Sequence, residues 1–487
     1  MLPIANATTP VMPASPEVTQ PNIVLVLSDD QSPDSISAMP YVSAASDWID
    51  FENAFFNVAL CCPSRASILS GQYAHHSGVW LNSDGPRFRD TDSVATWLNS
   101  AGYRTGLIGK YLNNYPYGDA PFVPPGWDDW QAFTGEVEYF DYTMTVNGSD
   151  EIYGSKPSDY STDVLARKAQ KFIETSVKPF FLMVAPHAPH VKAIPAPRHA
   201  HEFSRSSLTP SPNFNEADVS DKPRWVQQLP AVDASVAHED RLDQYRTLLS
   251  LDDLIRDVFL TLERSRILEE TVVIFMTDNG YSFGEHRWTG KRCEYDECMK
   301  TPLLIRYPGQ GGKKVRYLAQ NVDLASTIAE LAGVTPTIRQ DGRSLAPILR
   351  GETVTDWRTG LLLSNAAGDK LPEFWGIRTE RWKYVELATG ERELYDLEAD
   401  PQELDNRAGD VALATIEADL AGQLEVLKNE GGAGSAPPRP LLPAGVFGVK
   451  RATFLITAIA SAALVVVLIA VKRSRRRRGT TSEGVTN

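Results

Sequence analysis

"NIVLVLSDD", residues 22–30, is a continuous apolar run that ends in two acidic residues. A run of this kind is typical of a strand that is buried on both faces of a parallel sheet. "TVVIFMTDNG", residues 271–280, repeats the same design. Because parallel strands end at a common edge of their sheet, we expect the polar ends of both segments to lie together at that edge.

Two shorter apolar segments lie between them, "YRTGLIGKY" at residues 103–111 and "PFFLMVAPHAPH" at residues 179–190, and both end in polar residues. Helical patterns separate these segments: residues 90–101 begin with an acidic cap region, and residues 244–263 carry a stripe of apolar side chains. Alternating strands and helices predict an α/β fold with a large, mainly parallel central sheet flanked by helices.

The pattern changes after Thr335, where shorter apolar segments alternate with polar residues and end in turn signals. We expect a small antiparallel sheet closed by a helix over residues 411–429. The predicted organisation is a flexible N-terminal segment (1–20), a catalytic domain (21–335), a smaller C-terminal subdomain (336–429), a Gly/Pro-rich linker (430–451), a transmembrane helix (452–471) and a basic tail (472–487).

The predicted transmembrane helix, "ATFLITAIASAALVVVLIAV", is 20 residues without a charge, the length needed to cross ~30 Å of hydrocarbon. Six basic residues follow it and two precede it, so we expect a cytoplasmic tail and a membrane-anchored catalytic domain outside the cytoplasm. Residues 1–20 lack the basic and apolar regions of an export signal. We expect a start further upstream; the alternatives are an unusual export route or a cytosolic, tail-anchored body.

The net charge of the chain is −14. Residues 450–487 carry a net charge of +7, so the rest of the chain carries −21. A body this acidic has no global field for nucleic acid or long polyanions. We therefore expect no nucleic-acid partner, and an anionic substrate must be held by a local cluster of cations or by a metal.

The chain has four cysteines, Cys61, Cys62, Cys293 and Cys298. Vicinal cysteines seldom pair, because a disulfide needs well-separated Cα atoms. For Cys293 and Cys298 the sequence leaves two alternatives open, a loop disulfide or two free thiols.

The strand ends at Asp29, Asp30, Asp278 and Asn279 supply only oxygen donors. Such ligands suit a hard cation, calcium or magnesium, better than zinc. The alternative for either pair is a solvated strand end or a helix cap.

"CCPSRASILSG", residues 61–71, combines two cysteines with a Pro-Ser-Arg triplet. Considered alone, the cysteines could be small buried hydrophobic residues before a helix that Pro63 starts. The pattern C-x-P-S-R followed by A-S-I-L-S-G resembles the signature of the type I sulfatases, in which the first cysteine is oxidised to Cα-formylglycine. Cys61 matches the modified position and Cys62 the variable one.

The resemblance covers roughly residues 21–406 and is closest to N-acetylglucosamine-6-sulfatases and extracellular heparan sulfatases, through "GKYLNNYP", "QYRTLLSLDDLI" and "DNGYSFGEH". It implies an alkaline-phosphatase-like α/β sandwich. It also implies a metal site, usually calcium with magnesium as the alternative, formed by Asp29, Asp30, Asp278, Asn279 and the formylglycine from Cys61.

Four further residues match functional positions of the family. The resemblance implies that Arg65 steadies the formylglycine and that Lys110, His190 and Lys291 contact the sulfate. His187 is expected to cap or pack. Leu112 stands where many arylsulfatases have a histidine, which leaves open what orients the formylglycine hydroxyl; the alternatives are His75, His76 and His286.

The resemblance implies a sulfuric ester hydrolase. One hydroxyl of the hydrated formylglycine attacks sulfur, His190 with Lys291 protonates the leaving oxygen, and the second hydroxyl then expels sulfate. The implied partners are a formylglycine-generating enzyme during maturation and a small sulfated sugar or glycan end resembling N-acetylglucosamine 6-sulfate. The alternatives are a phosphonate or phosphate monoester hydrolase of the same superfamily, and a non-catalytic surface binding protein on this scaffold.

Overall fold

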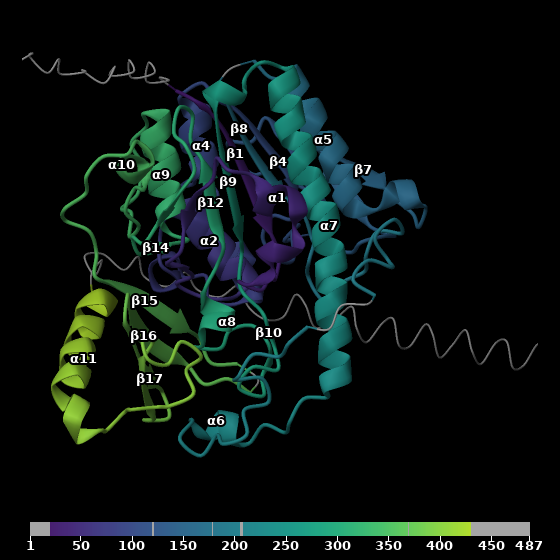
Figure 1. Ribbon diagram of the computed structural model, residues 1–487. Coiled ribbons are helices and arrows are strands. Elements are labelled where there is room, and N and C mark those ends of the chain that lie inside the picture. The colour runs from purple at the N-terminus through teal and green to yellow at the C-terminus, as the bar shows by residue number, and fades with distance from the viewer. Residues whose placement is uncertain (1–19, 119–120, 178, 205–207, 369, 430–487) are drawn as a thin grey trace, which may run out of the picture. The chain divides into compact units, whose positions relative to one another are not determined.

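A ten-stranded sheet crosses the part of the chain that the computed structural model describes, residues 20–118, 121–177, 179–204, 208–368 and 370–429 (Figure 1). Its strand order is β13-β2-β12-β9-β1-β8-β4-β5-β6-β7. The strands are β1 (Asn22–Ser28), β2 (Ile49–Phe51), β4 (Arg104–Gly109), β5 (Asp129–Thr134), β6 (Thr143–Val146), β7 (Ser149–Ile152), β8 (Phe180–Ala185), β9 (Thr271–Thr277), β12 (Leu303–Arg306) and β13 (Lys313–Val315).

The sheet is mixed, whereas the sequence predicts a mainly parallel one. Its centre, β9-β1-β8-β4-β5, is parallel as predicted. On one side β12 pairs antiparallel with β9 and β2, and on the other β5, β6 and β7 pair antiparallel. Strands β5, β6 and β7 follow one another through short connections, which cannot make the crossover that a parallel pair requires.

Two hydrophobic clusters cover the two faces of the sheet. Alternate residues of β1 face opposite sides, with Leu25 in one cluster and Val26 in the other. One face is covered by α2 (Cys61–Ser70), α4 (Val94–Ser100), α9 (Asp323–Ala332) and α10 (Ala346–Leu349); the other by α1 (Pro40–Ala44), α5 (Ser161–Thr175) and α7 (Ala234–Arg264) (Figure 1). The predicted layering of helices on both faces is therefore present.

The remaining elements of the main part are short. The two-stranded pairs are β3 (Ala54–Phe55) with β14 (Ala319–Gln320), and β10 (Ser282–Phe283) with β11 (Thr289–Gly290). The short helices are α3 (Ala74–Ser77), α6 (Arg224–Gln227) and α8 (Asp296–Met299), with 3-10 turns at Ser35–Ala38, Asn82–Arg87, Pro157–Asp159, Leu268–Glu270 and Val411–Leu413.

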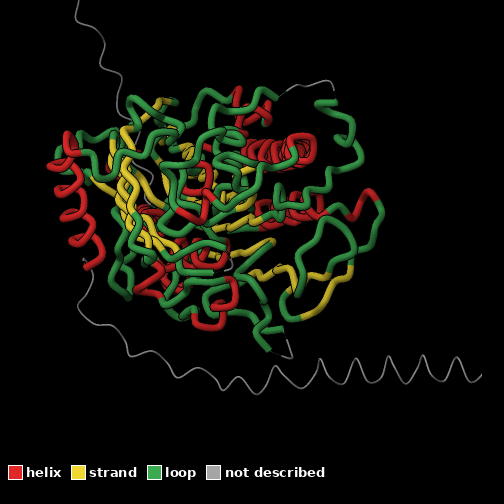
Figure 2. The backbone as a smooth tube through the Cα atoms, turned by 90° about the horizontal axis from the view of Figure 1, so that it is seen from below, coloured by secondary structure: helices red, strands yellow, loops and turns green. Residues whose placement is uncertain are grey.

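The small antiparallel sheet predicted after Thr335 is present, with the order β15 (Gly360–Asn365), β16 (Phe374–Thr379), β17 (Trp382–Leu387) and β18 (Arg392–Asp396). Helix α11 (Ala414–Asn429) lies along one face of it (Figures 1 and 2). Leu420 and Leu424 of the helix share a hydrophobic cluster with Leu362 and Ile377 of the sheet. This packing explains why the helix closes the sheet.

None of the described helices has the length and apolar composition that a membrane crossing requires. The chain divides into two units, Met1–Ala433 and Gly434–Asn487. The predicted linker, transmembrane helix (452–471) and basic tail lie outside the described residues, as does nearly all of the predicted N-terminal segment, so these parts stay predictions.

Candidate active site

The four oxygen-donor residues at the ends of β1 and β9 lie together. The parallel register pairs Ser28 with Thr277, so the next residues of both strands emerge side by side. The backbone N–H of Asp30 donates to Asp278 Oδ1 at 3.2 Å, and Asn279 Nδ2 donates to Asp30 Oδ1 at 2.6 Å. Asp29, Asp30, Asp278 and Asn279 are all fully buried.

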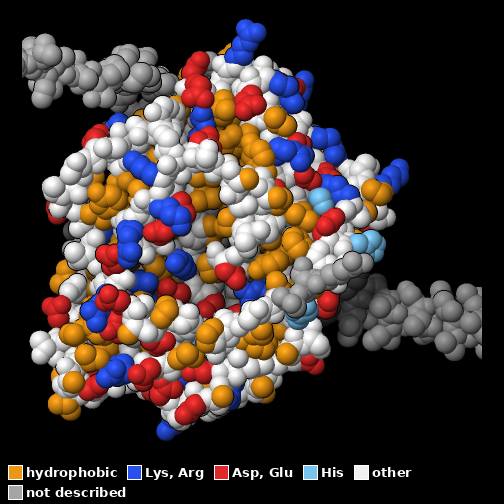
Figure 3. All heavy atoms as spheres, viewed as in Figure 1, with side chains coloured by type: hydrophobic (Ala, Val, Ile, Leu, Met, Phe, Trp, Pro, Cys, Tyr) orange, Lys and Arg blue, Asp and Glu red, His pale blue; other side chains and the backbone are white. Residues whose placement is uncertain are grey.

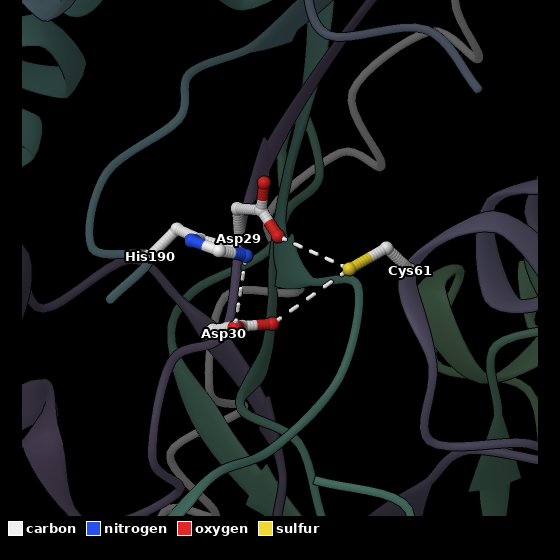
Figure 4. A group of neighbouring side chains, drawn as sticks. All are labelled: Asp29, Asp30, Cys61 and His190. Atoms are coloured by element: carbon white, nitrogen blue, oxygen red, sulfur yellow. Dashed lines mark hydrogen bonds and ion pairs between the residues drawn. The ribbon is translucent and has the colours of Figure 1, made fainter. Parts of the chain in front are cut away.

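Cys61 faces this group from the first turn of α2. Its Sγ lies 3.5 Å from Asp29 Oδ1 and 3.8 Å from Asp30 Oδ1. His190, which follows β8, places Nε2 3.3 Å from Asp30 Oδ2. Figure 4 shows these four side chains turned toward one another, and one ligand atom from each lies within 4.8 Å of the others.

Three cations surround the carboxylates. Lys110, directly after β4, places Nζ 2.5 Å from Asp29 Oδ2. Lys291, directly after β11, places Nζ 2.6 Å from Asp30 Oδ1 and 2.9 Å from Cys61 Sγ. Arg65, one helical turn after Cys61, donates to Asp278 Oδ2 at 2.7 Å and to the backbone oxygen of Lys110 at 2.8 Å. The structure thus brings every predicted site residue into one cluster.

The positive charge is local to this cluster. On the face seen in Figure 3, Lys and Arg side chains are interspersed with Asp and Glu side chains and form no broad basic field. Arg65 is fully buried, Lys110 is 4% exposed, and the Lys291 side chain is 17% exposed. An anion that enters the site therefore meets cations held at fixed positions.

Burial and neighbouring charges act in opposite directions on the pKa values of the cluster. Burial raises the pKa of Asp29, but Lys110 and His190 outweigh it and hold that pKa well below its usual range. The pKa of Asp278 is raised, because burial and Asp29 outweigh Arg65. Burial lowers the pKa of Lys291, yet Asp30 and Cys61 bring it well above the ordinary value. Burial also raises the pKa of the Cys61 thiol.

The residues present fit a hard cation. Asp29, Asp30 and Asp278 bring three buried carboxyl groups to one place, and Asn279 Oδ1 is buried without a hydrogen-bond partner among the described residues. Carboxylate and amide oxygens are the ligands that calcium and magnesium prefer. A cation here would satisfy the orphaned amide oxygen and offset the repulsion between the carboxylates.

His187 takes part in the cluster more closely than the sequence predicts. It packs as expected, with its ring 4.7 Å from that of His190 and 4.8 Å from that of Tyr139. Its Nδ1 also lies 3.6 Å from Asp29 Oδ2, and burial lowers its pKa to about 4. The sequence does contain a signal for this role: the Pro-His pair occurs twice, at residues 186–187 and 189–190, directly after the buried strand β8.

The alternatives for the histidine missing at Leu112 find other partners. His286 Nδ1 bonds Glu216 Oε2 at 2.7 Å, and its ring stacks on Tyr295 at 3.8 Å. His76 Nδ1 bonds Asp341 Oδ2 at 2.7 Å, and the ring of His75 lies 3.9 Å from that of His76. Within the described residues, no hydrogen bond or ion pair joins these three histidines to Cys61.

The remaining cysteines comprise one disulfide and one free thiol. Cys293 and Cys298 form a disulfide, so the first of the two open alternatives holds, and it closes the loop that follows Lys291. Cys62 is a free, buried thiol in the core, and its backbone N–H donates to Asn82 Oδ1 at 3.0 Å. Among the described hydrogen bonds, those from a thiol to the site carboxylates come from Cys61 and none from Cys62.

Comparison with known proteins gives two family matches. Residues 21–334 match the family described as Sulfatase, and residues 284–430 match N-sulphoglucosamine sulphohydrolase, C-terminal. Human N-acetylglucosamine-6-sulfatase is 34% identical over 372 residues, which cover 71% of this chain and 67% of that protein.

Two further similarities extend the comparison. The putative extracellular sulfatase Sulf-1 homolog of Caenorhabditis elegans is 32% identical over 390 residues, 74% of this chain; the match spans 54% of the worm protein, about half its length. A solved structure of a protein in complex with its substrate, D-glucosamine-2-N,6-O-disulfate, superposes with a TM-score of 0.75 at 26% identity, covering 86% of this chain and 100% of that one.

Proposed function

Because this chain belongs to the sulfatase family, we propose that it is a sulfuric ester hydrolase that cleaves sulfate monoesters of sugars. The observation that carries the proposal is the position of Cys61. Its Sγ lies within 4 Å of two carboxylates, those of Asp29 and Asp30, and of the Lys291 ammonium group.

The proposed nucleophile is a formylglycine hydrate made from Cys61, which a formylglycine-generating enzyme would produce during maturation. A sulfated thiol or serine would be a stable dead end, whereas the hydrate carries two hydroxyls on one carbon. One hydroxyl attacks sulfur, and the sulfur–oxygen bond to the sugar breaks. The second hydroxyl then loses its proton, the bond from carbon to the sulfate oxygen breaks, and the aldehyde returns and is rehydrated by water.

The proposed metal ligands are Asp29, Asp30, Asp278 and Asn279, with the modified side chain of Cys61 completing the set. Calcium is the expected ion, with magnesium as the alternative. When bound, the ion would supply electrostatic stabilisation to the sulfate oxygens and to the nucleophile.

The chain's own residues supply the rest of the chemistry. Arg65 ties Asp278 to the backbone of Lys110 and so fixes the helix turn beneath Cys61. The ammonium groups of Lys110 and Lys291 offset negative charge on the sulfuryl oxygens. His190, whose side chain is 27% exposed, donates a proton from Nε2 to the leaving sugar oxygen.

The proposed substrate is a sulfated glucosamine-type sugar, either small or at the end of a chain. The support comes from the named activity of the human relative and from the disulfated glucosamine in the structural neighbour. The acidic body disfavours a long polyanion, and the charges on the face seen in Figure 3 are mixed. We place the catalytic domain outside the cytoplasm, anchored by residues 452–471.

A pair of alanine variants tests the nucleophile. Cys61→Ala should lower the hydrolysis of glucosamine 6-sulfate by at least about a thousandfold, because no covalent step remains. Cys62→Ala, its neighbour in the core, should keep substantial activity. Peptide mass spectrometry of the native protein should find the Cys61 side chain as an aldehyde.

Two results would contradict the proposal. An unmodified Cys61 thiol in active native protein would exclude the formylglycine mechanism. Faster turnover of phosphate or phosphonate monoesters than of matched sulfate monoesters would assign the enzyme to the alternative reaction of the same superfamily.

A further inference from the structure

Asp30, a ligand in the proposed metal site, has an unusual backbone conformation. Its φ is 62°, in the left-handed region that residues other than glycine seldom adopt. Conformations of this kind persist when the surrounding structure holds them. The contacts of the Asp29–Ser32 turn therefore decide where the Asp30 carboxylate points.

The strand side of this turn is held by β9. The backbone N–H of Asp30 donates to Asp278 Oδ1 at 3.2 Å, and the backbone N–H of Gln31 donates to Thr277 Oγ1 at 3.2 Å. Both acceptors lie at the end of the neighbouring strand. These bonds fix the donors of the turn and leave its carbonyl oxygens to other partners.

The opposite side is held by one side chain of α7, Gln244, which is fully buried. Its Nε2 donates to the backbone oxygen of Asp30 at 2.9 Å. Its Oε1 accepts from Ser32 Oγ at 2.7 Å and from the backbone N–H of Ser32 at 3.5 Å. The orientation of the amide is fixed by its partners, because a carbonyl oxygen can only accept and a backbone N–H can only donate.

We infer that Gln244 is a positioning residue for the metal ligand Asp30, an inference that rests on the proposed function. By bridging the Asp30 carbonyl and Ser32, the amide holds the left-handed turn. The turn in turn sets the Asp30 carboxylate against Lys291 at 2.6 Å and Cys61 at 3.8 Å. Partners of this kind tune metal affinity without touching the ion.

Gln320 provides a matched control. It is also fully buried, and its Nε2 donates to a backbone oxygen, that of Leu362, at 2.7 Å. Gln320 belongs to β14, and no described hydrogen bond joins it to a proposed metal ligand. The same substitution at both positions thus removes the same kind of bond, but only one of the bonds holds the turn.

The experiment uses the full chain, freed of metal with a chelator and then titrated with calcium alone or magnesium alone by calorimetry. Gln244→Met and Gln320→Met keep side-chain length and lose the amide. Both should lower the melting temperature of the metal-free protein. Only Gln244→Met should weaken calcium binding, by about tenfold or more, while Gln320→Met stays within about twofold of wild type.

The outcomes separate the inference from the proposal beneath it. A folded Gln244→Met protein with the wild-type calcium Kd overturns the inference alone. A wild-type protein that binds neither ion overturns the proposed metal site, and the inference with it. Should Gln244→Met fail to fold, Ser32→Ala removes the hydroxyl that orients the amide; a Kd raised about threefold supports the inference, and an unchanged Kd overturns it.

Discussion

The molecule contains two clusters of buried charged side chains, and they differ in which of their residues are exposed to solvent. The active-site cluster joins Asp29, Asp30 and Asp278 to Arg65, Lys110 and Lys291. A second cluster, here called the subdomain cluster, lies where the loop around α8 meets the small sheet; it comprises Glu294, Asp296, Lys383, Glu393 and Glu403. Both contain carboxylates and lysines removed from water.

The lysine of the subdomain cluster is fully enclosed, and the cluster is called closed in this sense. Lys383 Nζ lies 2.5 Å from Glu403 Oε1 and 2.6 Å from Asp296 Oδ1, and Lys383 has no exposed surface. In the active-site cluster, by contrast, the lysine Lys291 and the histidine His190 keep 17% and 27% of their side chains exposed. In the subdomain cluster the exposed group is a carboxylate, Asp296, at 19%. The closed cluster therefore offers no cation to an incoming anion, whereas the active-site cluster presents Lys291 to one.

Replacing one lysine in each cluster gives the largest expected contrast. Lys383→Met leaves Glu403 without its cation and Asp296 with Arg378 alone, at 3.4 Å, so the free energy of unfolding should fall by about 3–5 kcal/mol. Lys110→Met should instead lower kcat for a sugar sulfate by a factor on the order of a hundred to a thousand. Urea unfolding and steady-state kinetics in calcium measure the two effects.

The two variants control for each other. The kcat of folded Lys383→Met protein should stay within about threefold of wild type, because Lys383 touches none of the proposed catalytic groups. A large loss of kcat in Lys383→Met without loss of stability would show that the two clusters do not divide their roles.

Substitutions at the two histidines of the active-site cluster, His187 and His190, distinguish their roles. His190→Gln should lower kcat for an alkyl sulfate by about ten- to a hundredfold, since a poor leaving group needs a proton donor. An activated aryl sulfate should lose much less. His187→Gln should affect both substrates alike, because the His187 side chain is only 8% exposed and lies against Asp29.

The reverse result would reassign the proton donor. If His187→Gln were the variant whose defect depends on the leaving group, the donor would be His187, and His190 would only line the entrance. Rates for the two sulfate classes at several pH values would distinguish these roles.

The active-site cluster is largely predictable from sequence because its information is local. Each apolar run ends in its own polar residues, and a parallel sheet brings the ends of its strands to one edge. Lys110 and His190 follow the same logic at the ends of β4 and β8. Arg65 also lies close in sequence, one helical turn from Cys61, but the family resemblance, and no local pattern, indicates its role.

Other features depend on contacts that no local pattern encodes. Strands β2 and β13 have three residues each, too few to show the alternation typical of a strand. The sequence therefore does not predict that the sheet is extended by these strands beyond its parallel centre. Helix α7 begins at Ala234, ahead of the predicted residue 244, because the Asp233 side chain caps its first turn. The predicted helix at residues 90–101 begins later, at Val94. The subdomain cluster joins residues about a hundred positions apart, and nothing in the sequence indicates it.

The smallest expected effect belongs to the closed cluster and concerns a proton. Glu294 is 1% exposed, accepts from Trp225 Nε1 at 3.0 Å, and interacts with the buried carboxyl group of Glu393. Burial and Glu393 raise the pKa of Glu294 well above its ordinary 4.5, and burial raises the pKa of Glu403 to about 7. At a pH above the pKa that Glu294 and Glu403 have in the unfolded chain, folding therefore takes up protons. The free energy of unfolding falls as the pH rises through this range.

Glu294→Gln should remove part of this pH dependence, because the amide keeps the shape and the hydrogen bonds but cannot ionise. Above pH 7 the contribution of Glu403 is spent, and the wild-type protein should still lose up to about 1.4 kcal/mol of stability per pH unit through Glu294. Urea unfolding at pH 7, 8 and 9 should give a shallower slope for the variant, while kcat at pH 7 stays close to wild type. An unchanged slope would mean that Glu294 is already ionised in the folded state, and that the closed cluster tolerates a charge that its burial argues against.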